Sequence, residues 1–547
     1  MGRRGMNVQI GKQGAGLGEE RAAGSTKDLP AGGADRKQSG RGRVLDVLII
    51  GSGFSGIGMA IKLQEEGMTD FLILEKTDGI GGTWYKNTYP GAACDVPSHF
   101  YCFSFAPNPD WSRIYSPQPE IQAYMERCAD QYGITPRIRF NSPVDLITFD
   151  DDTALWTVEL PDGAIYLARH VVIGSGGLNI PTVPDLPGLS DFERPAFHTA
   201  EWRHDLDLTG KEVVVIGSAA SAVQVVPEIA RYAKKVVMFQ RTPNYILPRM
   251  DRAYTDAEKA LFREKPWRLK LLRWKMFWRF EVVLTPLFKR RSWLRRRLAD
   301  KTRAYIRRAI KDPDLQEKLT PDYEMGCKRI LISDDFYGAL NRENVTVVTD
   351  GIDRIERDGV VDRAGNWHRA EALVLATGYD LHAHMTSIEV RGQGGVSLQS
   401  LWRDAPQAYE GAMVHGFPNL YFVTGPNTGV GSTSVVFMIE AQIRLILKGL
   451  KKAGRTRLLH PRAEVVEAHN DTLQKDLEKT VWATDCKSWY KAASGRIHTL
   501  YPRSAGHFLK RKLRLRMGDF ILESKSDDQI RAAEQKAGEY SLLEEKC

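Results

Sequence analysis

Two short apolar runs stand out in the hydrophobic pattern because each leads into a glycine-containing loop and then into a helical pattern. The first run is residues 47–50 and the second is residues 213–216. Uninterrupted apolar runs of this length, bounded by glycine, are typical of strands buried on both faces of a sheet. A strand, loop, helix and further strand form a βαβ unit, whose strands are parallel. The pattern therefore predicts an α/β fold with two Rossmann-like, doubly wound domains.

The loops after these runs have the residue types of a dinucleotide-binding turn. The candidate residues are Gly51, Gly53, Phe54, Ser55 and Gly56 in the first loop, and Gly217, Ser218, Ala219, Ser221 and Ala222 in the second. Glycine lets backbone N–H groups and a helix N-terminus approach a pyrophosphate. Ala219 stands where a glycine normally allows that approach, so an ordinary strand–helix turn is the alternative for the second loop.

The strands after the two loops end in residues of opposite charge. Glu75 closes residues 71–74, and Arg241 follows residues 236–240. An acid at this place accepts hydrogen bonds from a ribose diol, which favours FAD. A guanidinium can instead grip a 2′-phosphate, which favours NADPH. One chain with both nucleotides predicts electron transfer between them.

The rest of the pattern divides the chain into parts. Residues 1–43 have almost no large apolar side chains, which predicts a disordered leader. Prolines at 181, 184 and 187 mark an extended connection between the nucleotide domains. The apolar run 372–375 fits a central parallel strand, so we expect the chain to return there to the first sheet. The interleaved parts are an FAD-binding domain of residues 44–180 and 373–547, an NADPH-binding domain of residues 181–250 and 321–372, and a helical insertion of residues 251–320.

The insertion contains an amphipathic helical pattern rich in tryptophan and cations. Its apolar members are Trp267, Leu271, Trp274 and Trp278, beside Arg268, Lys270, Lys275 and Arg279. We expect a cap that packs these tryptophans on the nucleotide domain and leaves the cations in solvent, since core-facing aromatic stripes are common. The alternative, which is not favoured, is peripheral membrane contact through residues 267–298.

Length and charge narrow the function classes. A chain of 547 residues with 42% apolar residues predicts two or three packed domains. The formal charge of +9 suits anionic dinucleotides. Zinc-finger spacing, basic-zipper heptads and RNA-binding aromatic motifs are missing from the sequence, so nucleic-acid binding is not expected. The pattern has neither a secretion signal nor a membrane-spanning run, and we expect a cytoplasmic location.

The cysteines do not form a recognisable pattern. The six are Cys94, Cys102, Cys128, Cys327, Cys486 and Cys547, without a CxxC pair or metal-type spacing. This favours reduced thiols and argues against a redox disulfide.

Several further motifs accompany the two nucleotide loops. They are Gly81-Gly82-Thr83-Trp84, Cys94-Asp95, the series Phe192, His198 and Trp202, Phe239-Gln240-Arg241-Thr242-Pro243, Gly326-Cys327-Lys328-Arg329, and Ala376-Thr377-Gly378-Tyr379. Together this set resembles the flavin-dependent Baeyer–Villiger monooxygenases, especially the branch similar to 4-hydroxyacetophenone and ethionamide-activating monooxygenases. The resemblance runs from about residue 44 to near residue 511.

The resemblance implies an enzyme in which NADPH reduces FAD, dioxygen adds to the reduced ring, and a flavin peroxide inserts one oxygen atom next to the carbonyl of a small ketone. The product is an ester or lactone. A fixed cation in a water-poor site can stabilise a peroxide anion, and the resemblance gives this role to Arg329, oriented by Asp95. It gives the NADPH phosphate to Lys328, Arg241 and Thr242. Further cofactor-binding residues would be Lys76, Gly82, Thr83, Trp84, Tyr101, Thr377 and Gly378.

Alternatives remain open for both the site and the activity. In one, Arg329 is only a phosphate ligand and Asp95 a structural cap. In another, the enzyme oxidises nitrogen or sulfur in small molecules. A disulfide reductase would need two cysteines facing the flavin, and Cys94 and Cys102 are too widely spaced for that family's pair. A membrane-surface protein on an inactive flavoprotein fold is the alternative outside catalysis.

The linker motif suits a hinge better than a chemical group. His198 has a side chain that titrates near neutrality, but peroxide attack on a ketone needs no base on the substrate. We expect His198 and Trp202 to serve a hinge between the domains, with a purely structural histidine as the alternative. Arg194 and Arg203 depart from the family's usual linker residues, which puts its usual conformation in question.

Overall fold

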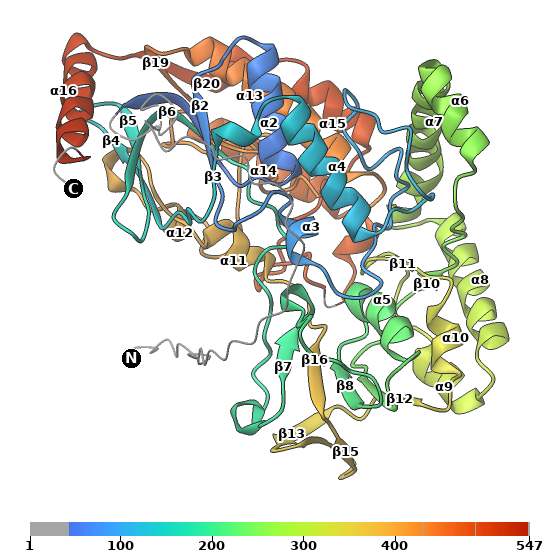
Figure 1. The fold of residues 1–547 in the computed structure, drawn as a ribbon. Helices are drawn as coiled ribbons and strands as arrows, with labels where there is room; N and C mark the ends of the chain where they lie inside the picture. The colour runs from blue at the N-terminus through green and yellow to red at the C-terminus, as the bar shows by residue number, and fades with distance from the viewer. Residues whose placement is uncertain (1–42, 430, 487, 545–547) are drawn as a thin grey trace, which may run out of the picture. The chain divides into compact units, whose positions relative to one another are not determined.

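The first sheet has a parallel centre built around the first apolar run. The computed structural model describes residues 43–429, 431–486 and 488–544, so the leader predicted at residues 1–43 lies outside the description except for Arg43. β1 (Val44–Ile50) lies between β2 (Phe71–Leu74) and β6 (Ile165–Ile173), and β3 (Ile138–Arg139) and β18 (Leu420–Phe422) extend the parallel set (Figure 1). The predicted βαβ unit is therefore present.

One edge of this sheet is antiparallel, which corrects the expectation of a purely parallel sheet. β4 (Leu146–Asp150) and β5 (Leu155–Glu159) form a hairpin that continues antiparallel to β6, and β17 (Glu389–Arg391) pairs with β4. A short turn between β4 and β5 is enough for antiparallel neighbours, whereas parallel neighbours need a crossover.

The second sheet is parallel throughout and contains the second apolar run. Its order is β12 (Val345–Val348), β9 (Lys235–Phe239), β8 (Glu212–Ile216), β16 (Ala372–Leu375) and β7 (Ala196–His198). The expectation that residues 372–375 return to the first sheet is wrong, because β16 pairs with β8 and β7. All four residues of β16 are buried, and the hydrophobic pattern of such a strand is the same whichever parallel sheet contains it. The chain returns to the first sheet at β17, which pairs with β4, and again at β18, which pairs with β6.

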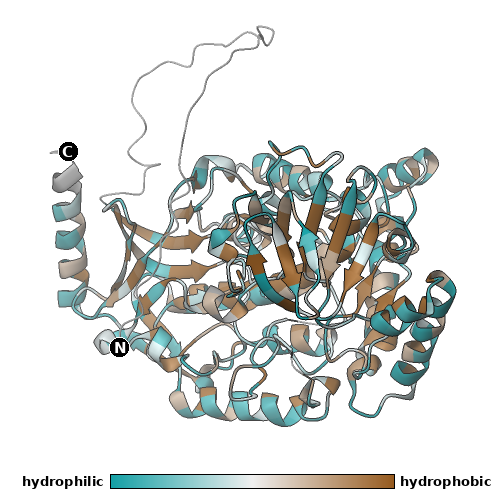
Figure 2. Cartoon of the chain, turned by 90° about the horizontal axis from the view of Figure 1, so that it is seen from below, coloured by the Kyte–Doolittle hydropathy of each residue, from teal (hydrophilic) through white to brown (hydrophobic). Residues whose placement is uncertain are grey.

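Helices cover both sheets, and Figure 2 shows the strands largely in the brown of hydrophobic residues. α2 (Phe54–Glu65) and α13 (Val435–Ala453) share the core of the first sheet, with Ile57, Ile61 and Ile443 among the buried side chains. α5 (Ala220–Ile229) and α10 (Phe336–Leu340) pack on the second sheet. The other helices of these parts are α3 (Thr83–Lys86), α4 (Gln118–Gln131), α11 (Leu381–Thr386), α12 (Leu398–Leu401), α14 (Ala463–Leu477), α15 (Ala505–Lys512) and α16 (Asp527–Glu544).

Three small sheets complete the strands. β13 (Ile352–Glu356), β14 (Gly359–Asp362) and β15 (Trp367–Arg369) form an antiparallel meander, β10 (Ile246–Leu247) pairs with β11 (Leu331–Ile332), and β19 (Arg457–Pro461) pairs with β20 (Phe520–Ser524). The short 3₁₀ segments are residues 135–137, 189–191, 199–201, 285–288, 393–395, 481–483 and 517–519.

The insertion is helical, as predicted. It contains α6 (Asp256–Glu264), α7 (Pro266–Arg279), a π-helical turn (Phe280–Leu284), α8 (Trp293–Ala309) and α9 (Pro313–Leu319). The sequence supplies the helix starts: Thr255 and Glu258 form a capping box, and Pro266 is the first residue of α7.

The orientation predicted for its tryptophans is wrong. Trp267, Trp274 and Trp278 are 58%, 59% and 47% exposed, so they do not pack on the nucleotide domain. α7 has apolar residues on both faces, and the packed face instead carries Leu269, which is 3% exposed.

Among the described residues, every helix is too short or too polar to span a lipid bilayer.

A buried ion cluster supports the loop before β18. Arg511 Nε donates to Glu410 Oε1 at 2.6 Å, and Lys512 Nζ donates to the Glu410 carbonyl oxygen at 2.7 Å and to its carboxylate. The next residue, Gly411, packs so tightly that an added Cβ would lie 2.7 Å from the Pro426 carbonyl oxygen. Burial acts to raise the pKa of Glu410, but the charges of Lys512, His469 and Arg511 outweigh it and lower that pKa to about 2.

We expect Glu410→Gln to lower the free energy of unfolding by about 3–5 kcal/mol at neutral pH, because it leaves two cations without their carboxylate. An unfolded glutamate titrates at about 4.3, so the depressed pKa stabilises the folded protein above that value. This stabilisation falls as the pH drops from about 5 towards 2, and the difference between wild type and variant should narrow over that range. Thermal and urea denaturation at several pH values measure it.

The matched control is Glu389→Gln, which breaks an ion pair with Arg391 whose two side chains are both 49% exposed. We expect a change within about 1 kcal/mol there. Equal effects of the two substitutions would show that the Glu410 cluster contributes no more than a surface pair.

Candidate active site

The first glycine loop turns the chain sharply between β1 and α2. Gly51 has φ of +94°, a conformation that favours glycine, and its N–H donates to the Leu74 carbonyl oxygen at 2.8 Å. A Cβ on Gly56 would lie 1.8 Å from the Gly51 carbonyl oxygen, so Gly56 allows the helix to pack on the loop. Beside Gly53 the nearest atom to an added Cβ is 3.8 Å away, which leaves its backbone open to a ligand.

Glu75 lies buried at the end of β2, directly beside this loop. Its Oε2 accepts from the Ser52 N–H at 2.7 Å and from Ser52 Oγ at 2.8 Å, and its Oε1 accepts from the Thr77 N–H at 3.0 Å. Thr77 Oγ1 lies 2.8 Å from Oε1 and 3.1 Å from the Gly79 carbonyl oxygen. A carboxylate offers about four lone-pair sites, so a ribose diol could donate to Glu75 once the Thr77 hydroxyl donates to Gly79 instead. Burial and the charge of Lys86 lower the pKa of the neighbouring Lys76 to about 8.

The glycine pair Gly81-Gly82 packs against the first loop. Gly82 has φ of +56°, and an added Cβ there would lie 3.2 Å from Gly53 Cα. Trp84 Nε1 donates to Tyr101 OH at 3.1 Å, and the Tyr101 ring meets Phe54 edge to face at 5.3 Å between centroids. Thr83 begins the short helix α3 between these groups. The predicted cofactor-binding residues Gly82, Thr83, Trp84 and Tyr101 therefore lie beside the first loop.

The second glycine loop repeats this geometry between β8 and α5. Gly217 has φ of +117°, and a Cβ there would lie 2.3 Å from the Ala376 carbonyl oxygen. Ser218 Oγ donates to the Thr242 carbonyl oxygen at 3.1 Å, which ties the loop to the strand end after β9. Ala219 directly precedes α5, has an extended backbone conformation, and is exposed. Ala219 lines the cavity at the N-terminus of α5.

Two cations gather at the end of β9. Arg241 is exposed and Lys328 is half-buried, and burial together with the charge of Arg241 lowers the pKa of Lys328. Lys328 Nζ also lies 4.8 Å from the centroid of the Tyr323 ring. Two like charges held beside each other are stabilised by an anion such as a phosphate.

An ion pair joins residues 234 positions apart in the sequence. Arg329 Nε donates to Asp95 Oδ2 at 3.0 Å, and Arg329 Nη2 donates to the same oxygen. The charge of Asp95 raises the pKa of Arg329, so the guanidinium stays charged. Arg329 is 47% exposed and Asp95 28% exposed, because both face an internal cavity.

Contacts between the first part of the chain and α5 place Asp95. Tyr89 OH donates to Gln224 Oε1 at 2.8 Å, and Gln224 Nε2 donates to the Ala93 carbonyl oxygen at 2.9 Å. Arg249 Nη2 donates to the Cys94 carbonyl oxygen at 3.0 Å. The sequence did not single out Gln224 or Arg249, since an isolated Gln on a helix or Arg in a loop carries no motif.

One cavity of about 2030 Å³ brings these groups together. It is lined by Gly51, Gly53, Phe54, Ser55, Glu75, Lys76, Gly82, Thr83, Trp84, Asp95, Tyr101, Gly217, Ser218, Ala219, Ser221, Arg241, Thr242, Lys328, Arg329, Thr377 and Gly378. Of the predicted site residues, only Gly56 and Ala222 do not line it, and both are buried in helix packing. The cavity wall also includes the apolar residues Phe280, Leu284 and Met438, with Arg279 beside them in the sequence.

The residues present fit two dinucleotides. The cavity is about twice the volume of a large single-ligand pocket. Each glycine loop opens a helix towards it, and the open space beside Gly53 can admit a pyrophosphate. Glu75 at one strand end suits an unphosphorylated ribose, while Arg241 and Lys328 at the other suit a phosphorylated one.

The linker motif lies away from the cavity wall. His198 ends β7, and its Nδ1 accepts from the Ala200 N–H at 3.0 Å. Burial lowers its pKa, so the ring is neutral at neutral pH. His198 does not line the cavity, which fits the expectation that it is no general base. Arg203 pairs with Asp205 on the surface.

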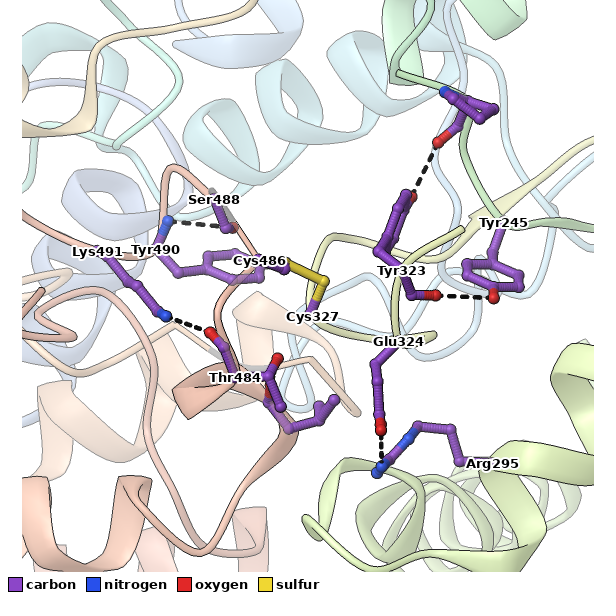
Figure 3. Close-up of a disulfide and its surroundings, with 12 residues drawn as sticks. Tyr245, Arg295, Tyr323, Glu324, Cys327, Thr484, Cys486, Ser488, Tyr490 and Lys491 are labelled. Atoms are coloured by element: carbon purple, nitrogen blue, oxygen red, sulfur yellow. Dashed lines mark hydrogen bonds and ion pairs between the residues drawn. A yellow bond between two sulfur atoms is a disulfide. The ribbon is translucent and has the colours of Figure 1, made fainter. Parts of the chain in front are cut away.

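A disulfide corrects the expectation of reduced cysteines. Cys327 is bonded to Cys486, 159 residues away (Figure 3). A separation of this size leaves no spacing signal in the sequence. Cys94, Cys102 and Cys128 are free and buried, and Cys547 lies outside the described residues. Neither bonded cysteine lines the cavity, which argues against the geometry of a disulfide reductase.

The disulfide helps to hold the segment that carries Arg329. On the same segment, the Tyr323 carbonyl oxygen accepts from Tyr245 OH at 2.9 Å, and Tyr323 OH donates to the Pro243 carbonyl oxygen at 3.0 Å (Figure 3). Arg295 from α8 pairs with Glu324. Three contacts therefore anchor the segment that carries Lys328 and Arg329. Arg295 ties it to the insertion, Pro243 to the strand end after β9, and Cys486 to the loop before Tyr490.

Comparison with known proteins agrees with this geometry. A family profile described as pyridine nucleotide-disulphide oxidoreductase matches residues 48–254. A Baeyer-Villiger monooxygenase of Pseudomonas aeruginosa is 44% identical over 462 residues, which are 83% of this chain and 87% of that protein. The crystal structure of cyclohexanone monooxygenase from Rhodococcus sp. Phi1 bound to NADP+ matches with a TM-score of 0.79 and 28% identity, over 88% of this chain and 99% of that chain. The crystal structure of an OTEMO complex with FAD and NADP matches with a TM-score of 0.80 and 26% identity, over 88% of this chain and 100% of that chain.

We expect Gly53→Ala to weaken FAD binding about tenfold or more while the fold is kept. Gly53 has φ of −76° and ψ of −170°, which alanine can adopt, but its methyl would enter the space that the pyrophosphate needs. Titration of the apoprotein with FAD, followed by flavin fluorescence, gives the dissociation constant.

Gly56→Ala serves as the contrast, because its methyl would meet backbone and should impair folding whether or not FAD is added. Gly338→Ala is the neutral control, with no atom within 4 Å of the added Cβ. FAD affinity unchanged in Gly53→Ala would mean that the pyrophosphate does not approach this residue.

Proposed function

The chain belongs to the Baeyer–Villiger monooxygenases, and from this premise we propose how its own residues serve the reaction. It is an NADPH- and FAD-dependent monooxygenase that inserts one oxygen atom of dioxygen next to the carbonyl of a small-molecule ketone, to give an ester or lactone, and releases the other atom as water. When bound, NADPH supplies a hydride and FAD relays its electrons to dioxygen.

Arg329 is the residue to which we assign stabilisation of negative charge during oxygen transfer. Its guanidinium carries its charge throughout the pH range of the enzyme and lies on the cavity wall, from which two bound cofactors would displace water. Asp95 would fix the orientation of the guanidinium through two donors on one oxygen, so that the remaining N–H groups point to the reacting atoms. This ion pair inside the shared cavity is the observation that carries the assignment.

The first loop and its neighbours would hold FAD. Gly51 and Gly53, with the N-terminus of α2 at Phe54 and Ser55, would bind the pyrophosphate, and Glu75 would accept from the ribose. Lys76, Gly82, Thr83, Trp84, Tyr101, Thr377 and Gly378 line the same cavity and would complete the site.

The second loop would hold NADPH. The N–H groups at Gly217 to Ser221 would bind the pyrophosphate, and Arg241, Thr242 and Lys328 the 2′-phosphate. The like charges of Arg241 and Lys328 support this assignment, because a phosphate relieves their repulsion.

The two sheets define the domains of this proposal. Residues 44–180, together with the chain after residue 376, would form the FAD-binding domain, and residues 181–250 and 321–376 the NADPH-binding domain. Residues 251–320 would form the insertion, whose Phe280 and Leu284 would contribute apolar wall for the ketone. We place the enzyme in the cytoplasm, where NADPH is available.

We expect Arg329→Ala to retain FAD and its reduction by NADPH but to lose ester formation about 10²–10³-fold, the usual effect of removing one group that stabilises developing charge. NADPH consumption should continue, with hydrogen peroxide as the product. Gas chromatography of the ester, alongside NADPH absorbance and a peroxide assay, measures the partition.

Arg354→Ala is the control for this substitution, since Arg354 forms an exposed pair with Glu356 and does not line the cavity. It should leave the ratio of ester to NADPH at the wild-type value. Retention of ester formation by Arg329→Ala would refute the role assigned to this guanidinium.

We expect Arg241→Ala to reduce the preference for NADPH over NADH about tenfold to a hundredfold, because a charge-assisted hydrogen bond to the 2′-phosphate is lost. The ratio of kcat/KM for the two cofactors is the measurement. Arg342→Ala, an exposed arginine of the second domain that does not line the cavity, is the control. An unaltered ratio in Arg241→Ala would move the phosphate site elsewhere.

A further inference from the structure

The outer face of α7 carries a continuous apolar stripe. Trp267, Leu271, Trp274 and Trp278 are 58%, 40%, 59% and 47% exposed, and their spacing of four, three and four residues places them on one side of the helix. Val282, 65% exposed in the π-helical turn, follows at the same spacing. We call these five residues the Trp stripe.

The exposure of the Trp stripe is to the outside of the molecule. None of its five residues lines the cavity, whereas Leu272, Met276 and Phe280 line it from the opposite side of the same segment. Figure 1 shows α7 at the edge of the fold. The helix therefore has an apolar face on each side, one towards the cavity and one towards solvent.

Polar and aromatic contacts fix this orientation. Arg273 donates from Nη1 to the His99 carbonyl oxygen at 2.6 Å. The rings of Phe277 and Phe437 lie 5.1 Å apart, and Glu281 Oε1 accepts from the Ala505 N–H at 2.7 Å. Turning the Trp stripe inward would break all three contacts. These contacts therefore hold the tryptophans on the outward face of α7.

The segment around the Trp stripe is strongly basic. Residues 265–308 contain sixteen Lys and Arg and two acidic residues, a net charge of +14, whereas the whole chain carries +9. Arg268, Lys270 and Lys275 are exposed on α7 itself and flank the stripe. Trp293 of α8 is 65% exposed, and Arg297 lies over its ring.

We propose that the Trp stripe and its flanking cations form a docking surface for an anionic phospholipid bilayer. Indole rings favour the boundary between headgroups and acyl chains, and lysine and arginine are attracted to lipid phosphates. A second copy of the chain on this face would bring two strongly positive segments together, which like-charge repulsion opposes. A nucleic acid would satisfy the cations but would leave Leu271 and Val282 without an apolar partner.

Docking in this way would place the cavity close to the membrane. The two faces of α7 are separated by one helix diameter, about 10 Å. The part of the cavity wall formed by Leu272, Met276 and Phe280 would then lie next to the acyl-chain boundary.

Sedimentation with vesicles tests the proposal on the FAD-loaded full chain. The probes are vesicles of phosphatidylcholine alone and vesicles containing about one third phosphatidylglycerol, at low and high salt. We expect binding to the anionic vesicles that falls about tenfold or more between low and high salt. Tryptophan emission should shift to the blue when the protein binds.

Two variants separate the apolar and the charged contributions. The triple substitution Trp267→Ser, Trp274→Ser and Trp278→Ser should weaken vesicle binding about tenfold or more and abolish the blue shift. The triple substitution Arg268→Gln, Lys270→Gln and Lys275→Gln should weaken binding and reduce its salt dependence. Trp367→Ser, which removes a 48% exposed tryptophan of β15, is the matched control and should bind like wild type. FAD content and melting temperature confirm the fold of each variant.

Several results would overturn the proposal. One is a wild-type protein that stays in the supernatant with anionic vesicles at low salt. Another is a tryptophan triple variant that binds as tightly as Trp367→Ser. A third is light scattering that shows a wild-type dimer dissociated by the tryptophan substitutions without any vesicle binding, which would make the face an interface between copies. Tight binding of RNA that the tryptophan substitutions leave unchanged, with no binding to vesicles, would equally reject it.

Discussion

The ion pair between Arg329 and Asp95 is the contact on which the arrangement of the site depends. It joins a segment after the insertion to a loop of the first domain, and both residues lie on the wall of one cavity. The carboxylate keeps the guanidinium charged and oriented, while the cavity leaves part of it accessible. A fixed cation is useful for oxygen transfer only if it does not move, and two sets of contacts restrain it. Gln224 holds the Asp95 loop on α5, and the Tyr323 contacts hold the Arg329 segment on Pro243.

The sequence predicted the parts of this site that depend on local backbone requirements. Gly51 and Gly217 need positive φ angles, and Glu75 and Arg241 follow buried strands, so strand patterning and glycine were sufficient to find both nucleotide loops. The ion pair itself came from the family resemblance, since no local rule connects residues so far apart. Gln224 and Arg249 were missed for the same reason: their roles arise only when loops from different parts of the chain meet.

Three errors have distinct physical causes. β16 was assigned to the wrong sheet because a fully buried parallel strand has the same pattern in either domain. The disulfide between Cys327 and Cys486 was missed because its ends are brought together by the tertiary fold. The tryptophans of α7 were expected to pack inward because this helix has large apolar residues on both faces, and only the partners of Arg273 and Phe277 decide which face is buried. Periodicity identifies a helix more securely than it identifies the buried side of a helix with apolar residues on two opposite faces.

The central claim is that Arg329 and Asp95 act as one unit in oxygen transfer, and a double-mutant cycle tests it most directly. The ratio of ester formed to NADPH consumed would be measured for wild type, Arg329→Lys, Asp95→Asn and the double variant. If the pair is a unit, each single change lowers the ratio and the double variant is little worse than either, so the effects are strongly non-additive. Fully additive effects, or an Asp95→Asn enzyme with the wild-type ratio, would contradict the account.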